Sequence, residues 1–453
     1  SEGSRLYVIY ICLIAALGGL LFGYDTAVIS GAIGYFKTYM NLTPFWEGWS
    51  VGCALLGCVL GAAAAGTASD RWGRKKVLIA SAVCFFVSAI GTAIPNDMLT
   101  YSFYRILGGL GVGAASMTSP LYIAEISPAK IRGIMVTVYQ LAIVIGIFIV
   151  YYINYFIADW HTEEWNIHYG WRWMFGSEAI PAFFFLLCLA WVPESPRWLI
   201  KQGREEEALD ILTRAGGTAH AQREAAEICE TIAHEGASIF QLLQPGLRRA
   251  LAVGVILAVL SQVSGINVFI YYASEIFNQL GFERNAALLQ QAIVGTVNLL
   301  FTFVALTAVD WFGRKPLLVF GALGMCLAHF CMGGLIFFGY SGVLLLVCVL
   351  FFIANFASSY GPVTWVVMSE IYPTRIRGRA MALATLSLWI ANYIVSQTFP
   401  MLNDNAWLIK TFNHSFPFWV YGSCCLFAMV FSLLFVPETK GRTLEEIETS
   451  WNR

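Results

Sequence analysis

The stretch DRWGRK at residues 70–75 returns, slightly altered, as DWFGRK at residues 310–315, which is 240 residues further along the chain. Two more pairs of motifs repeat at almost the same distance, with offsets of 245 and 244 residues: EISPAKIRG at 125–133 with EIYPTRIRG at 370–378, and PESPRW at 193–198 with PETKGR at 437–442. Three pairs with nearly one offset indicate that the chain consists of two similar halves.

Between the repeated motifs the chain is unusually apolar. Of its 453 residues, 58% are hydrophobic and only 12% are charged, and the mean hydropathy is +0.67. The charged fraction is about half that of an ordinary soluble domain, which indicates a protein that crosses a membrane many times. The formal net charge is −1 and the basic residues form no tail, so we expect the lipid bilayer, and not nucleic acid, as a partner.

The sequence shows no pattern typical of an enzyme or a metalloprotein. Its eleven cysteines lie mostly in apolar segments and have neither CxxC nor Cys/His spacing, so we expect buried thiols without a metal or a cofactor. No nucleophile lies beside a base in a recognisable motif, so catalysis is not expected.

Apolar runs of about 20 residues are long enough to cross a bilayer as single helices. The sequence contains twelve such candidates, at residues 7–33, 47–69, 76–95, 99–121, 133–157, 172–192, 250–278, 286–309, 316–338, 342–368, 379–401 and 415–436. The offset between the repeats covers six crossings, so the two halves have the same orientation in the membrane. An even number of crossings also puts both termini on one side.

The predicted fold is therefore an all-α membrane protein with twelve transmembrane helices in two parallel six-helix repeats. The one long polar interval, residues 201–246, has helical composition with interspersed charges and predicts short helices between the halves. We expect four parts: an N-terminal six-helix bundle at 1–198, a cytoplasmic helical linker at 199–246, a C-terminal six-helix bundle at 247–440 and a cytoplasmic tail at 441–453. Parallel repeats with a solute site at their interface are a transporter architecture.

The distribution of lysine and arginine predicts the orientation of the chain. The segments on the side of the termini carry 22 of the 27 basic residues, the opposite side carries four, and Arg105 lies within a span. Basic residues concentrate in the cytoplasmic loops of membrane proteins. We therefore expect both termini in the cytoplasm.

Asp25 is a carboxylate within the apolar segment 7–33. A charge in the bilayer costs several kcal/mol unless it is paired, so an acid in a span is a candidate functional residue. Arg105 and Glu178 also lie within spans, and the three residues are about eight, six and six residues from the outer ends of their helices. At these depths the three side chains could meet. The pair Asp25–Arg105 either locks two helices together or forms a site where Asp25 takes up a proton.

The repeated motifs, together with YRILGGLGVG at 104–113, VSGINVFIYYA at 263–273 and LLFGYDTAVISG at 20–31, resemble the sugar porter family of the major facilitator superfamily. The motifs run through the whole chain in the family's order, and they most resemble those of the bacterial D-xylose–proton symporters. The resemblance implies the major facilitator fold and a proton-coupled monosaccharide symporter that works by alternating access. It also implies a monomer in the bacterial inner (plasma) membrane. Passive facilitators of the family commonly carry Asn where this chain has Asp25.

Two other functions remain open from the sequence. The nearest is a passive sugar facilitator, in which Arg105 keeps Asp25 permanently charged. The other is a sugar sensor that does not transport, although sensors carry long cytoplasmic tails and this chain ends at Arg453, soon after its last span. The proton-coupling residues that we predict are Asp25, Arg105 and Glu178. Proton coupling requires Asp25 to take up and release a proton during transport, and protonation of Asp25 would release Arg105, which stays charged. Glu178 either tunes the pair or extends toward the outer surface.

Single polar residues in otherwise apolar spans are candidates for contacts with sugar hydroxyls, because such hydroxyls must exchange water for hydrogen bonds with protein. We predict that the substrate site is formed by Phe22, Gln140, Gln262, Asn267, Tyr271, Asn298, Gly361, Trp365, Trp389 and Asn392. All but Asn392 are on this list because the resemblance places them at the family's sugar-site positions. Any single amide could instead join two helices by a hydrogen bond.

Local breaks and substitutions affect the predicted sugar site. Gly265 permits a break that would turn Gln262 inward, and Gly361-Pro362 should interrupt the tenth helix just before Trp365. Xylose symporters usually have glutamine at three positions where this chain has Ile147, Ser261 and Leu388. With fewer amides available, the choice between xylose and glucose stays open.

The charged residues of the repeated motifs resemble the salt-bridge networks that hold the family's outward-facing state. We predict a gating network that comprises Asp70, Arg74, Glu125 and Arg132 in one half and Asp310, Arg314, Glu370 and Arg377 in the other. Single exposed ion pairs contribute only about 0–1 kcal/mol, but a network present in one state biases a two-state equilibrium. The basic residues alone could instead serve to set the orientation in the membrane, and the two roles are compatible.

Overall fold

The computed structural model describes residues 3–128, 130–233, 239–372, 377–442 and 444–451. Within these ranges every regular element is helical, and twelve helices are long and apolar enough to cross a membrane. The all-α prediction and the predicted number of spans are confirmed. Several helices are longer than the apolar runs: α1 covers Arg5–Met40, seven residues beyond the predicted end at Ile33, because residues 34–40 continue the helix to the left-handed cap at Asn41.

The first six spans form the N half of the molecule. They comprise α1 (Arg5–Met40), α2 (Pro44–Trp72), α3 (Arg74–Ala93), α4 (Met98–Ile126), α5 (Arg132–Asp159) and a sixth span made of α6 (Glu163–Trp165), the π-helix η1 (Asn166–Gly170), α7 (Trp171–Gly176) and α8 (Ala179–Leu189). The sixth span thus begins nine residues before its predicted start at residue 172.

The last six spans form the C half. They comprise α12 (Pro245–Val263) with α13 (Ile266–Tyr271), α15 (Arg284–Phe312), α16 (Arg314–Phe337), α17 (Val343–Ala357) with α18 (Tyr360–Ile371), α19 (Arg377–Asn403) and α21 (Phe416–Phe435), and the short helices α14 (Ala273–Gln279) and α20 (Ala406–Phe412) adjoin them. Between and after the halves lie α9 (Pro196–Lys201), α10 (Glu205–Gly216), α11 (Thr218–Ala233), the 3-10 helix η2 (Ile239–Leu243) and α22 (Leu444–Ser450). The division of the chain into four parts stays a prediction.

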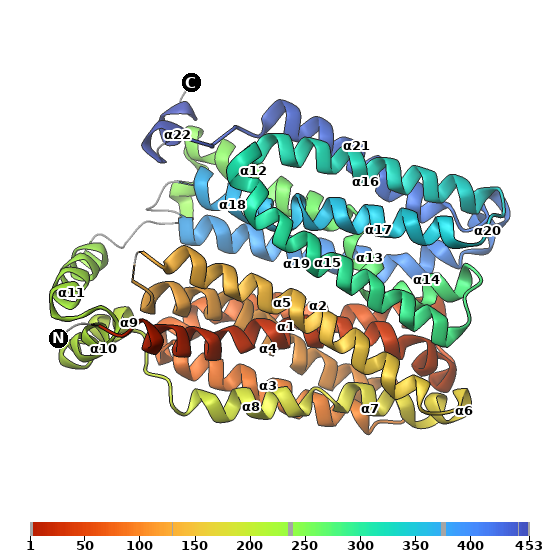
Figure 1. Ribbon diagram of the computed structural model, residues 1–453, viewed down its shortest axis with the longest axis horizontal. Helices are drawn as coiled ribbons and strands as arrows, with labels where there is room; N and C mark the ends of the chain where they lie inside the picture. The colour runs from red at the N-terminus through yellow and green to blue at the C-terminus, as the bar shows by residue number, and fades with distance from the viewer. Residues whose placement is uncertain (1–2, 129, 234–238, 373–376, 443, 452–453) are drawn as a thin grey trace.

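The two halves lie side by side with their long helices roughly parallel, the N half in red to yellow and the C half in green to blue (Figure 1). They meet where α2 packs against α19 and α5 packs against α15. The start of α1, the helices α10 and α11, and α22 all lie at one end of the molecule, which we call the terminal end (Figure 1). The opposite end, with α6, α14 and α20, is the far end. The described parts nearest the two termini, the start of α1 and α22, therefore lie on the same side, as the even number of spans predicts.

Two spans of the C half are broken near the middle. In the seventh span the break is at Gly265, whose φ of 90° lies in the left-handed region that glycine adopts without strain, so this prediction is confirmed. In the tenth span the break falls at Ser358 and Ser359, earlier than predicted. Pro362 lies in the first turn of α18, where proline's missing N–H has no hydrogen bond to break, so it starts the new helix and does not interrupt it.

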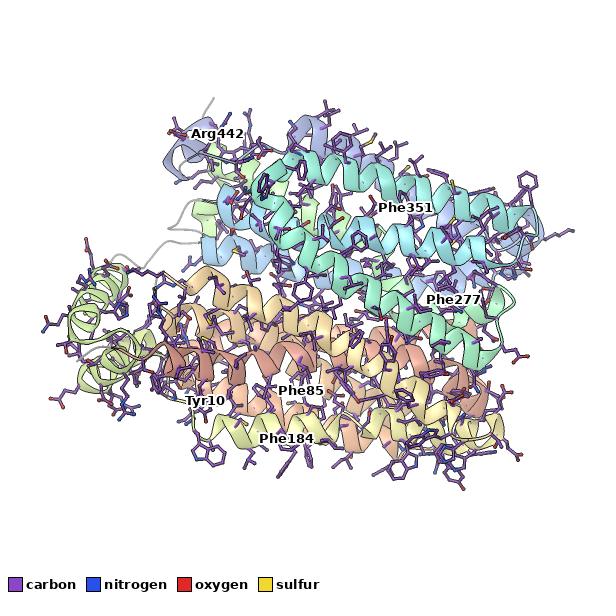
Figure 2. The ribbon with its side chains drawn as sticks, in the orientation of Figure 1. Tyr10, Phe85, Phe184, Phe277, Phe351 and Arg442 are labelled. Atoms are coloured by element: carbon purple, nitrogen blue, oxygen red, sulfur yellow. The ribbon has the colours of Figure 1, made fainter. Side chains whose placement is uncertain are left out.

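Large apolar side chains cover the outside of the bundle as well as its interior. Phe184 on α8 and Phe351 on α17 are largely exposed, whereas Phe85 is buried between helices (Figure 2). A soluble protein rarely exposes so much contiguous apolar surface, whereas spanning helices turn such side chains toward lipid. Inside, α2 and α4 approach closely because Gly57 and Gly109 face the backbone of the opposing helix, where a Cβ atom would collide with a carbonyl oxygen.

Candidate functional site

Asp25 and Arg105 meet in the middle of the N half, as their matching depths predict. Nη1 of Arg105 lies 3.0 Å from Oδ1 of Asp25 and 3.2 Å from its backbone oxygen. Asp25 has no exposed surface and Arg105 is 2% exposed. In the described part of the chain, Oδ2 of Asp25 and Nε of Arg105 have no hydrogen-bond partner. The pair is thus buried and only partly satisfied.

The surroundings of the pair are apolar and closely packed. The guanidinium of Arg105 lies 5.5 Å from the centre of the Phe175 ring, a cation–π distance. Gly108, one turn after Arg105, leaves room for the carboxylate: a Cβ atom there would lie 3.0 Å from Oδ2 of Asp25 and would also collide with Oγ of Ser88. The position of the Asp25 carboxylate therefore depends on a glycine.

Glu178 completes a trio of buried charged residues. It is 2% exposed, and its carboxyl interacts electrostatically with both Asp25 and Arg105. Its Oε1 atom has no hydrogen-bond partner among the described residues. Burial at this depth contradicts the alternative that Glu178 extends toward the outer surface. Arg105 forms its ion pair with Asp25, and Glu178 adds a second buried carboxyl group near them.

The predicted sugar residues of the seventh span contact one another. The break at Gly265 brings the amides of Gln262 and Asn267 together, and Nδ2 of Asn267 donates to Oε1 of Gln262. Nε2 of Gln262 donates to Oγ of Ser261 at 3.1 Å. Ser261, where xylose symporters usually have glutamine, therefore orients the neighbouring amide.

Asn392 does not present a free amide. Its Nδ2 donates to the hydroxyl of Tyr271 at 3.1 Å, and its Oδ1 accepts from Oγ of Ser396 at 3.1 Å. Because both ends of the amide are occupied, the geometry favours a role in positioning Tyr271 over direct contact with a sugar. Of the predicted sugar residues on the seventh span, Tyr271 is thus the one that α19 holds through a hydrogen bond.

Aromatic rings from the two halves meet near Asp25. Phe22, one turn before Asp25, packs against Trp389 of the C half with ring centroids 5.3 Å apart. Nε1 of Trp389 is buried without a hydrogen-bond partner in the described part. A donor of this kind beside an aromatic face is suited to a sugar hydroxyl.

The remaining predicted sugar residues occupy separate helices. Gln140 lies on α5, Asn298 on α15, and Gly361 and Trp365 on α18. Within the described residues the side chains of Gln140, Asn298 and Trp365 show no hydrogen bond to another predicted sugar residue. Three positions that lack the usual glutamine are largely buried: Ile147, Ser261 and Leu388.

At the terminal end, the predicted network of the N half forms around Arg74. Its Nε and Nη2 atoms lie 3.0 and 2.8 Å from the two carboxylate oxygens of Glu125, and Nη1 lies 3.2 Å from Oδ1 of Asp70. Such a two-pronged arginine–carboxylate contact is among the stronger polar interactions in proteins. Arg132 is not part of it: its guanidinium donates to the backbone oxygens of Ala124 and Ser127, because the end of α4 leaves these carbonyls without helical partners.

The C half repeats the arrangement with one difference. Arg314 contacts Glu370 through Nε at 3.2 Å and Nη2 at 2.7 Å. Its Nη1 donates to the backbone oxygen of Val309, and Asp310 is exposed without an ion pair among the described residues. Asp310 is thus not part of the network in this state, and its role in the outward-facing state stays a prediction. Nη1 of Arg314 thus bonds a backbone oxygen only. Nη1 of Arg74 bonds both the backbone oxygen of Ser69 and the carboxylate of Asp70. The side chain of Arg377 lies outside the described residues.

Two glutamates that we did not predict complete these networks. Glu194 accepts from the backbone N–H groups of Arg74 and Lys75, and Glu438 accepts from those of Arg314 and Lys315. Each carboxylate thus caps the N-terminus of a helix, α3 or α16, from far along the chain. The signal was present in the sequence, because both glutamates belong to the third repeated motif.

The polar contacts that join the two halves in the described residues gather toward the far end. Oγ of Ser30 donates to Oε1 of Gln291 at 2.9 Å, Ser274 donates to the backbone oxygen of Ser30, and Gln397 donates to the backbone oxygen of Phe45 at 3.0 Å. The sequence offered no signal for these contacts, since they depend on how the halves pack.

Comparison with known proteins is consistent with this geometry. Residues 11–451 match the family described as sugar (and other) transporter. The chain is 45% identical to the D-xylose-proton symporter of Escherichia coli strain K12, over 100% of this chain and 97% of that protein. It is 42% identical to the arabinose-proton symporter of Bacillus subtilis strain 168, over 99% of this chain and 96% of that one.

Solved structures of the E. coli xylose transporter are similar as well. The inward-open conformation matches with a TM-score of 0.86 at 43% identity, over 98% of this chain and 100% of that chain. The proton:xylose symporter bound to 6-bromo-6-deoxy-D-glucose matches with a TM-score of 0.81 at 44% identity, over 98% and 99% of the two chains. The backbone described above is thus more similar to the inward-open arrangement.

Proposed function

The chain belongs to the sugar transporter family of the major facilitator superfamily, and from that premise we propose how its residues move a sugar with a proton. The protein is a proton-coupled sugar symporter, not an enzyme. The observation that carries the residue-level proposal is the buried ion pair between Asp25 on α1 and Arg105 on α4, within the N half.

Asp25 is the proton site in this proposal. When it is charged, its attraction to Arg105 ties α1 to α4. When it is protonated, the Coulomb attraction is lost, and α1 is freer to move relative to α4. A membrane potential adds about 2.3 kcal/mol per elementary charge per 100 mV to the inward movement of the proton.

Glu178 makes the trio responsive to a single proton. If both carboxyl groups are ionised, the trio carries one excess negative charge in a site away from water, which is costly. One proton held by Asp25 or Glu178 makes the trio neutral. Proton uptake and release can therefore be coupled to small changes in the distance between Asp25 and Arg105.

The sugar binds between the halves in this proposal. Gln140, Gln262, Asn267 and Asn298 supply amides, and Phe22, Trp365 and Trp389 supply aromatic faces for the sugar's C–H groups. Tyr271, which Asn392 holds, connects the bound sugar to Asp25 and Arg105. The substrate is a monosaccharide, pentose or hexose; because Ile147 and Leu388 replace amides, fewer polar groups surround the sugar than in a typical xylose site.

The terminal end faces the cytoplasm, since 22 of the 27 basic residues lie on that side of the predicted spans. The chain works as a monomer in the inner (plasma) membrane of a bacterium. In the structure the contacts between halves gather at the far end, so the carrier is closed to the outside. The ion pairs Arg74–Glu125 and Arg314–Glu370 each lie within one half and are already formed in this state, so in this proposal they favour the outward-facing state only through the contacts that their loops make when the cytoplasmic ends meet.

Uptake into proteoliposomes tests the proposal against a passive facilitator. Xylose and glucose uptake is measured with and without an imposed inward proton gradient, for the wild-type protein, Asp25→Asn and the matched control Asp159→Asn, an exposed carboxylate at the end of α5. We expect gradient-driven accumulation in the wild type and the control, and only exchange of labelled for unlabelled sugar in Asp25→Asn. Accumulation that persists in Asp25→Asn would assign the proton to another residue.

A further inference from the structure

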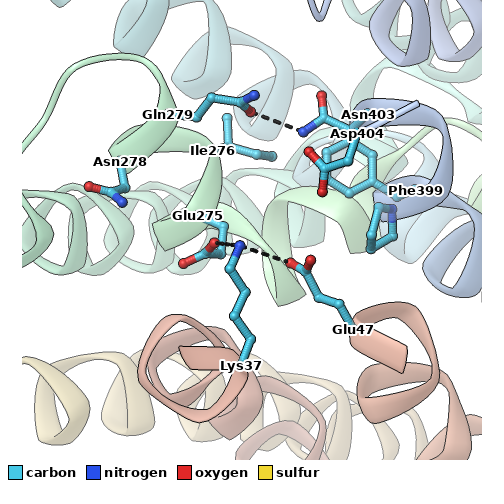
Figure 3. Close-up of a pocket in the computed structure, with 10 residues that line it drawn as sticks. Lys37, Glu47, Glu275, Ile276, Asn278, Gln279, Phe399, Asn403 and Asp404 are labelled. Atoms are coloured by element: carbon cyan, nitrogen blue, oxygen red, sulfur yellow. Dashed lines mark hydrogen bonds and ion pairs between the residues drawn. The ribbon is translucent and has the colours of Figure 1, made fainter. Parts of the chain in front are cut away.

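Lys37, in the last turn of α1, bonds to both halves at the far end. Its Nζ lies 2.6 Å from Oε2 of Glu275 on α14, in the C half, and 3.6 Å from Oε1 of Glu47 on α2, in its own half. Figure 3 shows the Lys37 side chain reaching up between the two carboxylates. Glu47 and Glu275 are largely buried, with side chains 7% and 15% exposed.

Arg284, at the start of α15, has the same pattern from the opposite side. Its Nη1 lies 3.7 Å from Oε1 of Glu275, in its own half, and its Nε lies 3.3 Å from Oε1 of Glu163 on α6, in the N half. The guanidinium also lies 5.0 Å from the centre of the Tyr35 ring of α1. Each of the two cations therefore has one carboxylate in its own half and one across the interface.

A cavity of about 200 Å³ adjoins these charges. Lys37, Glu47 and Glu275 line it together with Gln279, Asn403 and Asp404 (Figure 3). Gln279 and Asn403 bond to each other at 3.0 Å, so the C-half wall of the cavity is joined internally. Water in this cavity can hydrate Lys37 when its partners separate.

We propose that Lys37, Glu47, Glu275, Arg284 and Glu163 form a far-end latch in which the cations exchange partners as the carrier opens. This inference rests on the proposed alternating access. In the closed state Lys37 binds Glu275 and Arg284 binds Glu163, which joins the halves. In the open state Lys37 keeps Glu47 and Arg284 keeps Glu275, so each half retains its own ion pair.

The second partner of each cation is what makes this arrangement reversible. A half-buried charge that loses its only partner is left partly desolvated, and such a lock would hold the carrier closed. With a carboxylate available in each half, opening costs only the difference between two ion pairs. Glu163 is the one residue that loses its partner, and its side chain is 64% exposed, so water solvates it. The latch therefore biases the equilibrium without blocking transport.

The proposal makes opposite predictions for two sets of substitutions. Glu47→Gln removes the partner that Lys37 needs in the open state, so the fraction of closed molecules should rise. The double variant Glu275→Gln/Arg284→Gln removes both ion pairs between the halves and leaves Lys37 with Glu47. The fraction of open molecules should therefore rise. We expect changes of about two- to fivefold in the ratio of open to closed molecules, in opposite directions, because each change alters only the difference between two alternative ion pairs of partly exposed cations.

Distances between two spin labels measure this ratio without any transport. The labels are placed at the far end on Glu164→Cys of the N half and Ser341→Cys of the C half, in a background where the exposed Cys229 and Cys331 are serine. The control is Lys410→Gln, which removes an exposed positive charge from α20 that forms no ion pair in the described residues. It should leave the distance distribution unchanged.

Failure of the far-end latch and failure of the proposed proton site at Asp25 give different results. If both sets of variants shift the labels in the same direction, or neither shifts them, the latch is disproved whatever the transport assay shows. If the labels report the expected opposite shifts but Asp25→Asn still accumulates sugar, the latch stands and the proposed proton site is wrong.

Discussion

Arg105 uses one nitrogen, Nη1, to bond both the carboxylate and the backbone oxygen of Asp25, at 3.0 and 3.2 Å. The guanidinium is thereby held to α1 in two ways, and only one of them depends on the charge of Asp25. Protonation of the carboxyl weakens the first contact and leaves the second. This geometry suits a site that must loosen and re-form in each transport cycle.

Removal of Arg105 alone should be far more harmful than removal of the whole pair. Arg105→Met leaves the Asp25 carboxylate buried without a counter-charge, and loss of one partner of a buried pair costs about 3–5 kcal/mol. Asp25→Asn/Arg105→Met leaves no charge unpaired and should regain most of this stability. Thermal unfolding of the purified variants measures whether Arg105→Met is less stable than the double variant. Equal destabilisation of the single and double variants would contradict it.

Gly108→Ala should impair transport through Asp25, because the added Cβ meets Oδ2 of Asp25 and Ser88. The matched control is Gly66→Ala on α2, where nothing lies within 4 Å of the new Cβ. The control should be neutral or stabilise the helix by about 0.5–1 kcal/mol. Uptake at saturating sugar is measured for both, with Gly108→Ala/Ser88→Gly expected to recover part of the activity. Normal uptake by Gly108→Ala would show that the carboxylate has more freedom than the structure indicates.

Asn392→Ala and Tyr271→Phe should weaken sugar binding for the same reason, which is the loss of the hydrogen bond between these two residues. Each change removes the 3.1 Å hydrogen bond that holds the Tyr271 hydroxyl, a contribution of about 0.5–1.5 kcal/mol. The KM for sugar should therefore rise about two- to tenfold in either variant, and the double variant should be little worse than the single ones. Additive effects would instead assign Asn392 a direct contact with the sugar.

Glu438→Ala should destabilise the C half, whereas Asp310→Ala should not. Glu438 caps the first two N–H groups of α16, and loss of a cap costs about 0.5–2 kcal/mol. Asp310 is exposed and its removal should stay within about 0.5 kcal/mol. Thermal unfolding of the two alanine variants compares them directly. A larger loss of stability for Asp310→Ala than for Glu438→Ala would show that Asp310 takes part in the ion-pair network in solution.

Much of the architecture follows from local sequence. A span needs only a run of apolar side chains, and the repeated motifs show that the two halves match, so the number of helices and their common orientation need no tertiary information. Asp25 was recognisable because the cost of a charge in an apolar segment depends on that segment alone. Its meeting with Arg105 was predictable since depth along a helix can be counted in residues.

Only the tertiary structure decided which faces meet and which partners are chosen. The amide of Asn392 could have pointed at the sugar, but the packing of α19 against α13 directs it to Tyr271. Arg132 and Asp310 carry suitable charges, yet Arg132 bonds backbone carbonyls and lies 4.0 Å from Glu224 of α11, and Asp310 is exposed to water, so neither joins Arg74 or Arg314 in this state. The partners of Lys37 lie 10 and 238 residues away, and the distant one is available only while the halves close at the far end. Sequence determined the spans and the buried charges because these are local properties; the pairing of side chains between helices depends on how two separately folded halves pack together.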